Sequence, residues 1–214
     1  MPTQVSYPGV YIEEVPSQVR TITGVATSIT AFIGRALRGP TNDPTLVQNF
    51  SEYTRRFGGL SRESTMSYAV RHFFQAGGVD ALIVRVVDAT AAASTAALTA
   101  EGGGPTIDLE AANPGTWGDN LSVTVDYNTR PRPDGTPDPA LFNLTVQEIN
   151  DVGDVVAEEI FPNVSFEAAR ERYLNTVLEE ESDLVRVTNT DYTSRPQDAT
   201  TAFNIDGNDG GPIG

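Results

Sequence analysis

The 214-residue sequence contains no cysteine, and all 14 of its basic residues are arginine, so lysine is absent too. Without cysteine, the chain can form no disulfide, no thiolate zinc site and no cysteine nucleophile. Without lysine, the glycine run at residues 102–104 cannot be a phosphate-binding loop of the Walker type. No apolar run approaches the length of a bilayer crossing, so we expect no membrane insertion.

The charge is one-sided, because 29 acidic residues outnumber the 14 arginines and give a net charge of −15. Such a surface repels phosphates, which argues against nucleic-acid binding, and it also opposes self-association at low salt. The acidic excess without lysine suggests a salt-loving or GC-rich source. The amino end has Pro2 and polar residues where a signal peptide has a positive region and an apolar one, so we do not expect classical secretion.

Residues 25–88 are predicted to form a partial α/β layer. Residues 25–35 alternate as a strand with Ile29, Ala31 and Ile33 on one face. Residues 79–87 form a second strand, and its residues 81–87 are apolar on both faces apart from Arg85, which is typical of the inside of a layered sheet. A connection of this length predicts that the two strands are parallel.

Two helices are predicted between those strands. The first is short, with Ser51 as its cap, Tyr53 and Phe57 on its apolar side, and Gly58 at its end. The second follows Ser64 and Thr65 and ends at residues 77–78. Its predicted buried face is formed by Met66, Ala69, Val70, Phe73 and Phe74.

A second domain is predicted over residues 105–193, after a small-residue linker at 89–104 and before a C-terminal linker at 194–214. Alternating residues predict antiparallel strands at 121–127, 142–148 and 155–161, with further strands at 107–111 and 184–188. We expect Ser165 to cap a helix that presents Ala169, Leu174, Tyr173, Val177 and Leu178 to this sheet. The predicted class is α+β: an extended arm at 1–24, a partial α/β layer at 25–88 and a mainly antiparallel β domain with one helix.

The arm contains a strand without a local partner. Its residues are Tyr7, Pro8, Val10, Tyr11, Ile12, Glu13 and Val15, with Pro16 behind them. The two prolines limit the strand, which suits a sheet edge. No hairpin turn follows, so its backbone groups must pair with a distant part of this chain or with another chain. Both readings, an ordinary first strand and an arm that joins a neighbour's sheet, stay open from these residues alone.

No residue constellation predicts catalysis or a cofactor. His72 is the only histidine, and no nucleophile elbow accompanies it. The stretch 206–210 superficially matches a calcium loop but has Gly210 at the fifth position and no later glutamate, so a solvated linker is the better interpretation. Trp117 is the only tryptophan, and we interpret it as a plug over the core of the second domain, with sugar stacking as the functional rival.

Three motifs, in order along the chain, resemble the sheath proteins of contractile phage tails and related contractile injection systems. The first is the arm motif at residues 7–14. The second runs from Gly34-Arg35-Ala36 through Gly39-Pro40 and Phe57-Gly58-Gly59 to Arg85-Val86-Val87. The third, which is the most specific, is the signature turn of Asn113, Pro114, Gly115, Trp117, Gly118 and Asn120, followed by the strand at 121–127.

The resemblance implies a structural subunit and not an enzyme. Members of this family polymerise around an inner tube, join neighbouring subunits through their arms, meet baseplate and cap proteins, and contract to drive the tube through a target envelope. It implies a location in a virion tail, or in an injection particle assembled in the cytoplasm. Residues 7–15 would then be the inter-subunit arm.

The chain departs from the family pattern after residues 206–211. Sheath proteins continue there into a larger C-terminal region that completes the α/β domain, and this region is absent from the sequence. The chain would then be a fragment, half of a split gene, or a short paralogue that acts as an initiator, cap or decoration. An alternative interpretation, from another functional class, is a non-polymerising cap or binding module of the tail. It would use Trp117 and the loop at residues 130–139 to recognise a glycan or a baseplate partner.

Overall fold

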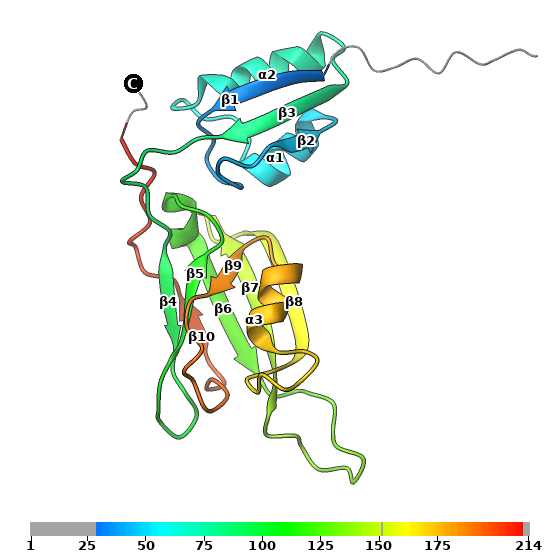
Figure 1. Cartoon of the computed structure of the whole chain (residues 1–214), viewed down its shortest axis with the longest axis vertical. Helices are drawn as coiled ribbons and strands as arrows, with labels where there is room; N and C mark the ends of the chain where they lie inside the picture. Colours follow the sequence, from blue (N-terminus) through cyan, green and yellow to red (C-terminus); the bar gives the residue numbers. More distant parts are fainter. Residues whose placement is uncertain (1–28, 151, 212–214) are drawn as a thin grey trace, which may run out of the picture.

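The computed structural model describes residues 29–150 and 152–211, which form three α-helices and ten strands (Figure 1). Two separate hydrophobic cores divide these residues. We call residues 29–88 the first unit and residues 89–211 the second unit. The predicted α+β class is confirmed. The predicted arm lies outside the described residues.

The first unit is a three-stranded sheet with both of its helices on one face. Its elements are β1 (Ile29–Gly34), β2 (Thr45–Val47), α1 (Phe50–Phe57), α2 (Thr65–Gln75) and β3 (Asp80–Arg85). The strand order is β1-β3-β2, with β1 parallel to β3 as predicted and β2 antiparallel to it. The core lies between this sheet and the helices, where Ala81 and Ile83 pack against Tyr53, Phe57 and Val70.

The helix ends follow from local chemistry. Asn49, not Ser51, caps α1, because its side chain accepts from the backbone N–H of Glu52 at 2.8 Å. Gly58 ends that helix in the left-handed conformation, as predicted. Ser64 caps α2 as expected. Ala69 was wrongly placed on the buried face of α2, since it is exposed.

The second unit contains two sheets around one core. One sheet has the order β4-β5-β9, formed by β4 (Thr95–Leu98), β5 (Ile107–Ala111) and β9 (Val185–Val187). The other has the order β10-β6-β7-β8, formed by β6 (Leu121–Asp126), β7 (Leu141–Ile149), β8 (Val155–Ser165) and β10 (Thr200–Ala202). The antiparallel meander β6-β7-β8 agrees with the prediction.

Both segments predicted as linkers contribute strands to this unit. Thr95–Leu98 pairs with β5, and Thr200–Ala202 pairs with β6. Their small and polar residues are typical of loops. The neighbouring strands nevertheless supply backbone partners, and Leu98 and Phe203 enter the core. The interpretation of these stretches as linkers was therefore wrong at these positions.

The helix of the second unit starts later than predicted. It is α3 (Leu174–Glu181), with Tyr173 at its amino end. Ser165 does not cap it, because this residue is still paired with Leu141 at the end of β8. Ala169 lies before the helix, whereas Leu174, Val177 and Leu178 are buried against the sheet as expected. Backbone pairing between β7 and the end of β8 therefore outweighed the local sequence pattern that predicted a helix start at Ser165.

Candidate functional site

The end of β3 carries a buried arginine that joins the two units. Arg85 has only 1% of its surface exposed. In the first unit its guanidinium donates to the carbonyl oxygens of Ala36 at 3.0 Å and Gly39 at 2.9 Å, and in the second unit to that of Pro114 at 2.7 Å. The planar fork of an arginine suits several fixed acceptors at once. Arg85 is thus a structural bracket between the units.

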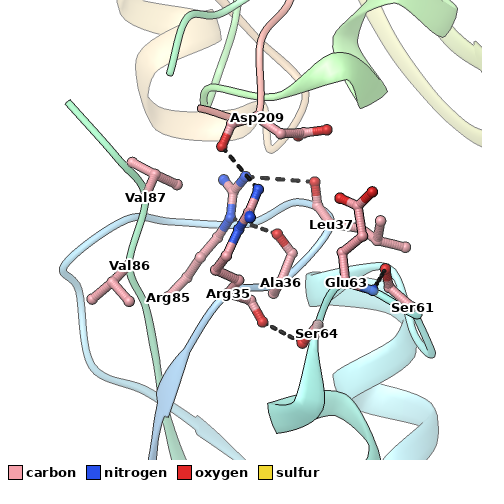
Figure 2. A pocket seen from close by; sticks show the side chains of 10 residues that line it. All are labelled: Arg35, Ala36, Leu37, Ser61, Glu63, Ser64, Arg85, Val86, Val87 and Asp209. Carbon is pink, nitrogen blue, oxygen red and sulfur yellow. Dashed lines mark hydrogen bonds between the residues drawn. The ribbon is translucent and has the colours of Figure 1, made fainter. Parts of the chain in front are cut away.

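Burial lowers the pKa of Arg85 to about 10, and the neighbouring charge of Asp209 partly opposes that shift. Arg35 lies beside Arg85 and adds to the lowering (Figure 2). The guanidinium therefore stays charged at neutral pH. Its charge faces backbone carbonyl dipoles and the carboxylate of Asp209.

The signature turn lies at this junction. It leads into a short 3-10 helix, Thr116–Asn120, that precedes β6. Gly115 has a φ of +134°, and a Cβ there would lie 2.8 Å from an oxygen of Asp209 and 3.2 Å from the Arg85 guanidinium. Gly118 is not among the glycines with a positive φ. Gly118 is needed for space, because a Cβ would lie 2.7 Å from the Cβ of Ala111.

Trp117 is the core plug predicted from the sequence. It is 8% exposed, packs in the core of the second unit and donates from its ring N–H to the carbonyl of Asn113 at 3.2 Å. Its faces are therefore covered by this chain. Asn120, the last residue of the signature, is exposed at the surface.

The segment around Asn208 returns from the second unit and pairs with the segment around Ala92, which leaves the first unit. We call these two paired segments the neck. Ala92 and Asn208 exchange two backbone hydrogen bonds of 2.9 Å, and Arg35 donates to the carbonyl of Asp209 at 3.3 Å. Figure 1 shows the two segments side by side between the units. The second unit is therefore entered and left at one place.

Two carboxylates in a stretch that was predicted to be a solvated linker anchor the returning segment of the neck to the second unit. Asp206 accepts from the N–H of Thr95 at 2.9 Å and from its hydroxyl at 2.7 Å. Asp209 accepts from the hydroxyl of Thr116 at 2.8 Å. The linker interpretation was therefore wrong for residues 206–209, whose side chains bind the second unit.

A further ion pair, between Arg38 and Glu148, crosses from the first unit to the second. Both side chains are mostly buried, with 16% and 12% exposed. Arg38 also donates to the carbonyl of Arg55 at 2.7 Å, which anchors it to α1. No pattern in the sequence indicated this ion pair, whose two residues are 110 positions apart.

The cavities at the junction are of two kinds. The cavity in Figure 2, beside Arg35, Ser64 and Arg85, has about 20 Å³, the size of a single water molecule. A broad cleft of about 1290 Å³ separates the units elsewhere. One wall of the cleft carries Arg55 and Arg56, and the other carries Glu158 and Asp183.

The remaining sequence candidates fall in different places. His72 is exposed on α2. Within residues 29–150 and 152–211, no three metal-ligating side chains come together, and no helix is long and apolar enough to cross a bilayer. The arm residues Tyr7, Pro8, Val10, Tyr11, Ile12, Glu13 and Val15 lie outside the described residues.

The fold is similar to part of the solved structure of a sheath tail protein. The sheath tail protein of Listeria innocua shares 17% identity with this chain, with a TM-score of 0.54 over 86% of this chain and 35% of that protein. The sheath tail protein of Desulfitobacterium hafniense shares 15% identity, with a TM-score of 0.49 over 96% of this chain and 40% of that protein.

These similarities concern the fold. The chain spans little more than a third of the length of the Listeria protein. No protein-family profile matches the sequence, and no curated protein matches it. The contacts at the junction of the two units are therefore the features of this chain itself that bear on its function.

Proposed function

We propose that this chain is a structural subunit of the contractile sheath of a phage tail or a related injection system. The observation that carries the proposal is the similarity of its fold to a sheath tail protein across both units. The junction supports it, because Arg85, the signature turn and the neck connect the two units by hydrogen bonds. Subunits of this kind would polymerise around an inner tube, contact baseplate and cap proteins, and contract.

Residues 7–15 are proposed as the arm that links neighbouring subunits. Heterologous contacts of this kind build open helical assemblies, and a shared strand gives a strong connection between subunits that move. A double substitution, Val10→Asp with Ile12→Asp, is expected to abolish assembly and to leave the circular dichroism of the isolated chain unchanged.

A matched control adds the same two charges elsewhere. Val152 and Ile205 are 85% and 91% exposed, so Val152→Asp with Ile205→Asp should leave assembly intact. Assembly is measured as the pelleted fraction after ultracentrifugation. Pelleting of the arm variant at the level of the control would show that the arm does not link subunits.

The alternative is a cap or binding module of the tail. The loop at residues 130–139 favours it, because Arg132 and Arg170 each contact Asp138 at 3.2 Å and fix this loop far from the neck. Burial of Trp117 contradicts sugar stacking by that residue. Titration with sugars should therefore leave its fluorescence unchanged, and a saturable change would favour the binding module.

A further inference from the structure

The small cavity in Figure 2 is lined by two arginines of like charge. Arg85, which is 1% exposed, and the partly buried Arg35 lie side by side in its wall. Two guanidinium groups that are close together and shielded from water repel one another strongly. A buried charge is stable only when an opposite charge or hydrogen-bond acceptors face it. The groups around the cavity therefore have to balance this pair.

This pair stands out because the chain as a whole is acidic. Residues 29–88 carry seven arginines and five carboxylates, a net +2, whereas residues 89–211 carry six arginines and 22 carboxylates, a net −16. An acidic surface repels anions. Binding of an anion therefore requires a place where positive charges gather locally, and the first unit supplies both arginines of the cavity.

The carboxylates near the cavity do not balance both arginines. The charge of Asp209 acts on Arg85, but the same carboxylate also accepts from the backbone N–H of Thr116 at 3.2 Å and from its hydroxyl at 2.8 Å. Glu63 lines the cavity but is exposed, and it forms no ion pair with a described residue. Apart from this exposed group, two positive charges face one negative charge.

The guanidinium of Arg35 also has unused donors among the described residues. Only its Nη2 donates to them, to the carbonyl oxygens of Asp209 at 3.3 Å and Gly210 at 3.5 Å, and both contacts are long. Arg85, in contrast, donates from all three of its nitrogens to backbone carbonyls. Since polar groups in such places are normally paired, an acceptor for Arg35 is expected in the cavity that it lines.

The volume of the cavity limits what this acceptor can be. About 20 Å³ holds one water molecule or one monatomic ion, and an oxyanion such as sulfate is too large. Part of the wall is apolar, with Ala36, Val86 and Val87. Apolar contacts penalise a strongly hydrated ion such as fluoride more than a larger halide. Size and lining together select chloride among the common anions.

We propose that this cavity binds a single chloride ion, which accepts from the unused N–H groups of Arg35 and balances the charge of the arginine pair. Hydrogen bonds from a cation to an anion are stronger than those between neutral groups. A water molecule would accept the same N–H groups but leave the surplus charge in place. The ion lies where the ends of β1 and β3 meet the returning segment of the neck, so its binding stabilises that contact. This site is independent of the sheath role.

The first test compares two sodium salts, chloride and gluconate, at the same concentrations up to molar. Both screen charges equally, but gluconate is too large for the cavity. Once chloride exceeds its dissociation constant about tenfold, the melting temperature should be about 3–6 °C higher in chloride than in gluconate. Equal melting temperatures in the two salts at every concentration would overturn the proposal.

A pair of variants locates the effect. Arg35→Gln removes a charge of the cavity, and the matched control Arg71→Gln removes one from the exposed surface of α2. The readout is the difference between the two salts, so any general loss of stability in a variant cancels. The difference should vanish in Arg35→Gln and persist in Arg71→Gln. A difference that persists unchanged in Arg35→Gln would overturn the proposed site.

Crystals grown in sodium bromide give the direct test, because bromide replaces chloride and scatters X-rays anomalously. One anomalous peak is expected in the cavity, beside the guanidinium of Arg35. A water molecule there without an anomalous peak would overturn the proposal. Peaks confined to exposed arginines such as Arg71 would show an adventitious ion only, and would overturn it as well.

Discussion

Arg85 donates a 2.7 Å hydrogen bond to the carbonyl oxygen of Pro114, and this contact ties the end of β3 to the signature turn. The two residues lie in the first and the second unit, whose hydrophobic cores are separate. The same guanidinium holds the carbonyls of Ala36 and Gly39, so a single side chain fixes the turn against the first unit.

The first prediction removes that bracket. Replacement Arg85→Met keeps most of the volume but leaves buried carbonyl oxygens unpaired, which costs about 1–3 kcal/mol for each. We expect the free energy of unfolding around the junction to fall by roughly 3 kcal/mol. Urea unfolding followed by Trp117 fluorescence measures it, because this tryptophan lies in the signature turn.

The control is Arg71→Met on the exposed surface of α2, which is expected to change stability by less than about 0.5 kcal/mol. If Arg85→Met lowered the free energy of unfolding as little as Arg71→Met, the contacts of Arg85 would not hold the two units together. Arg85→Lys should resemble the methionine variant, since an ammonium group lacks the planar fork.

The second prediction concerns the space around Gly118. A methyl group there meets the Cβ of Ala111 and the hydroxyl of Ser94, both at 2.7 Å, so Gly118→Ala should lower the free energy of unfolding by about 1–3 kcal/mol. The comparison is Gly135→Asn, in open space with a φ of +82° that asparagine tolerates. The stability of both variants is measured by thermal melting. An equal loss of stability in the two variants would contradict the lack of space at Gly118.

The third prediction is a pH dependence at Glu159. Burial raises the pKa of this carboxyl, and hydrogen bonds from Ser182 and the backbone of Asp183 oppose the shift in part. The folded chain thus holds the proton more tightly than the unfolded chain, so stability is lost as pH rises through the raised pKa. Glu159→Gln should be more stable than the unsubstituted chain at pH 7, and the difference should shrink below pH about 4, where both states are protonated.

The exposed Glu180→Gln is the matched control for that measurement. Its stability relative to the unsubstituted chain should vary little with pH. A Glu159→Gln difference that stayed constant from pH 4 to pH 7 would show that the cost of burying the carboxylate is absent.

The fourth prediction concerns salt. The second unit has a net charge of −16, and its carboxylates repel one another in the folded state. Screening ions weaken this repulsion, so the melting temperature should rise steadily from dilute buffer to molar salt. Differential scanning calorimetry over this range measures it. A flat profile would contradict both this account and the idea of a salt-loving source.

Local patterns predicted β1, β3 and both helices of the first unit well, whereas β2 was not predicted. Alternation located β6 and β7, and the spacing of Met66, Val70 and Phe73 located α2, because these signals depend on residues close in sequence. The strand β10 escaped prediction, since Thr200–Ala202 becomes a strand only through pairing with β6. The start of α3 was missed for the same reason, because the end of β8 claims Ser165.

The junction could be predicted only in part. The signature turn was found from its glycines and Trp117, and Arg85 stood out as the one charge in the apolar run at residues 81–87. Its partners could not be read, because backbone carbonyls are present at every residue and leave no sequence signal. The same holds for Asp206 and Asp209, whose threonine partners lie more than 90 residues away.

Negative-stain electron microscopy of the purified chain tests the central claim most directly. The chain is imaged alone and after co-expression with the reading frame that follows it, at low and at high salt. The account predicts striated hollow tubes in at least one condition, with high salt favouring them because screening weakens repulsion between acidic subunits. Single particles of uniform size in every condition would contradict a sheath role and favour the cap or binding module.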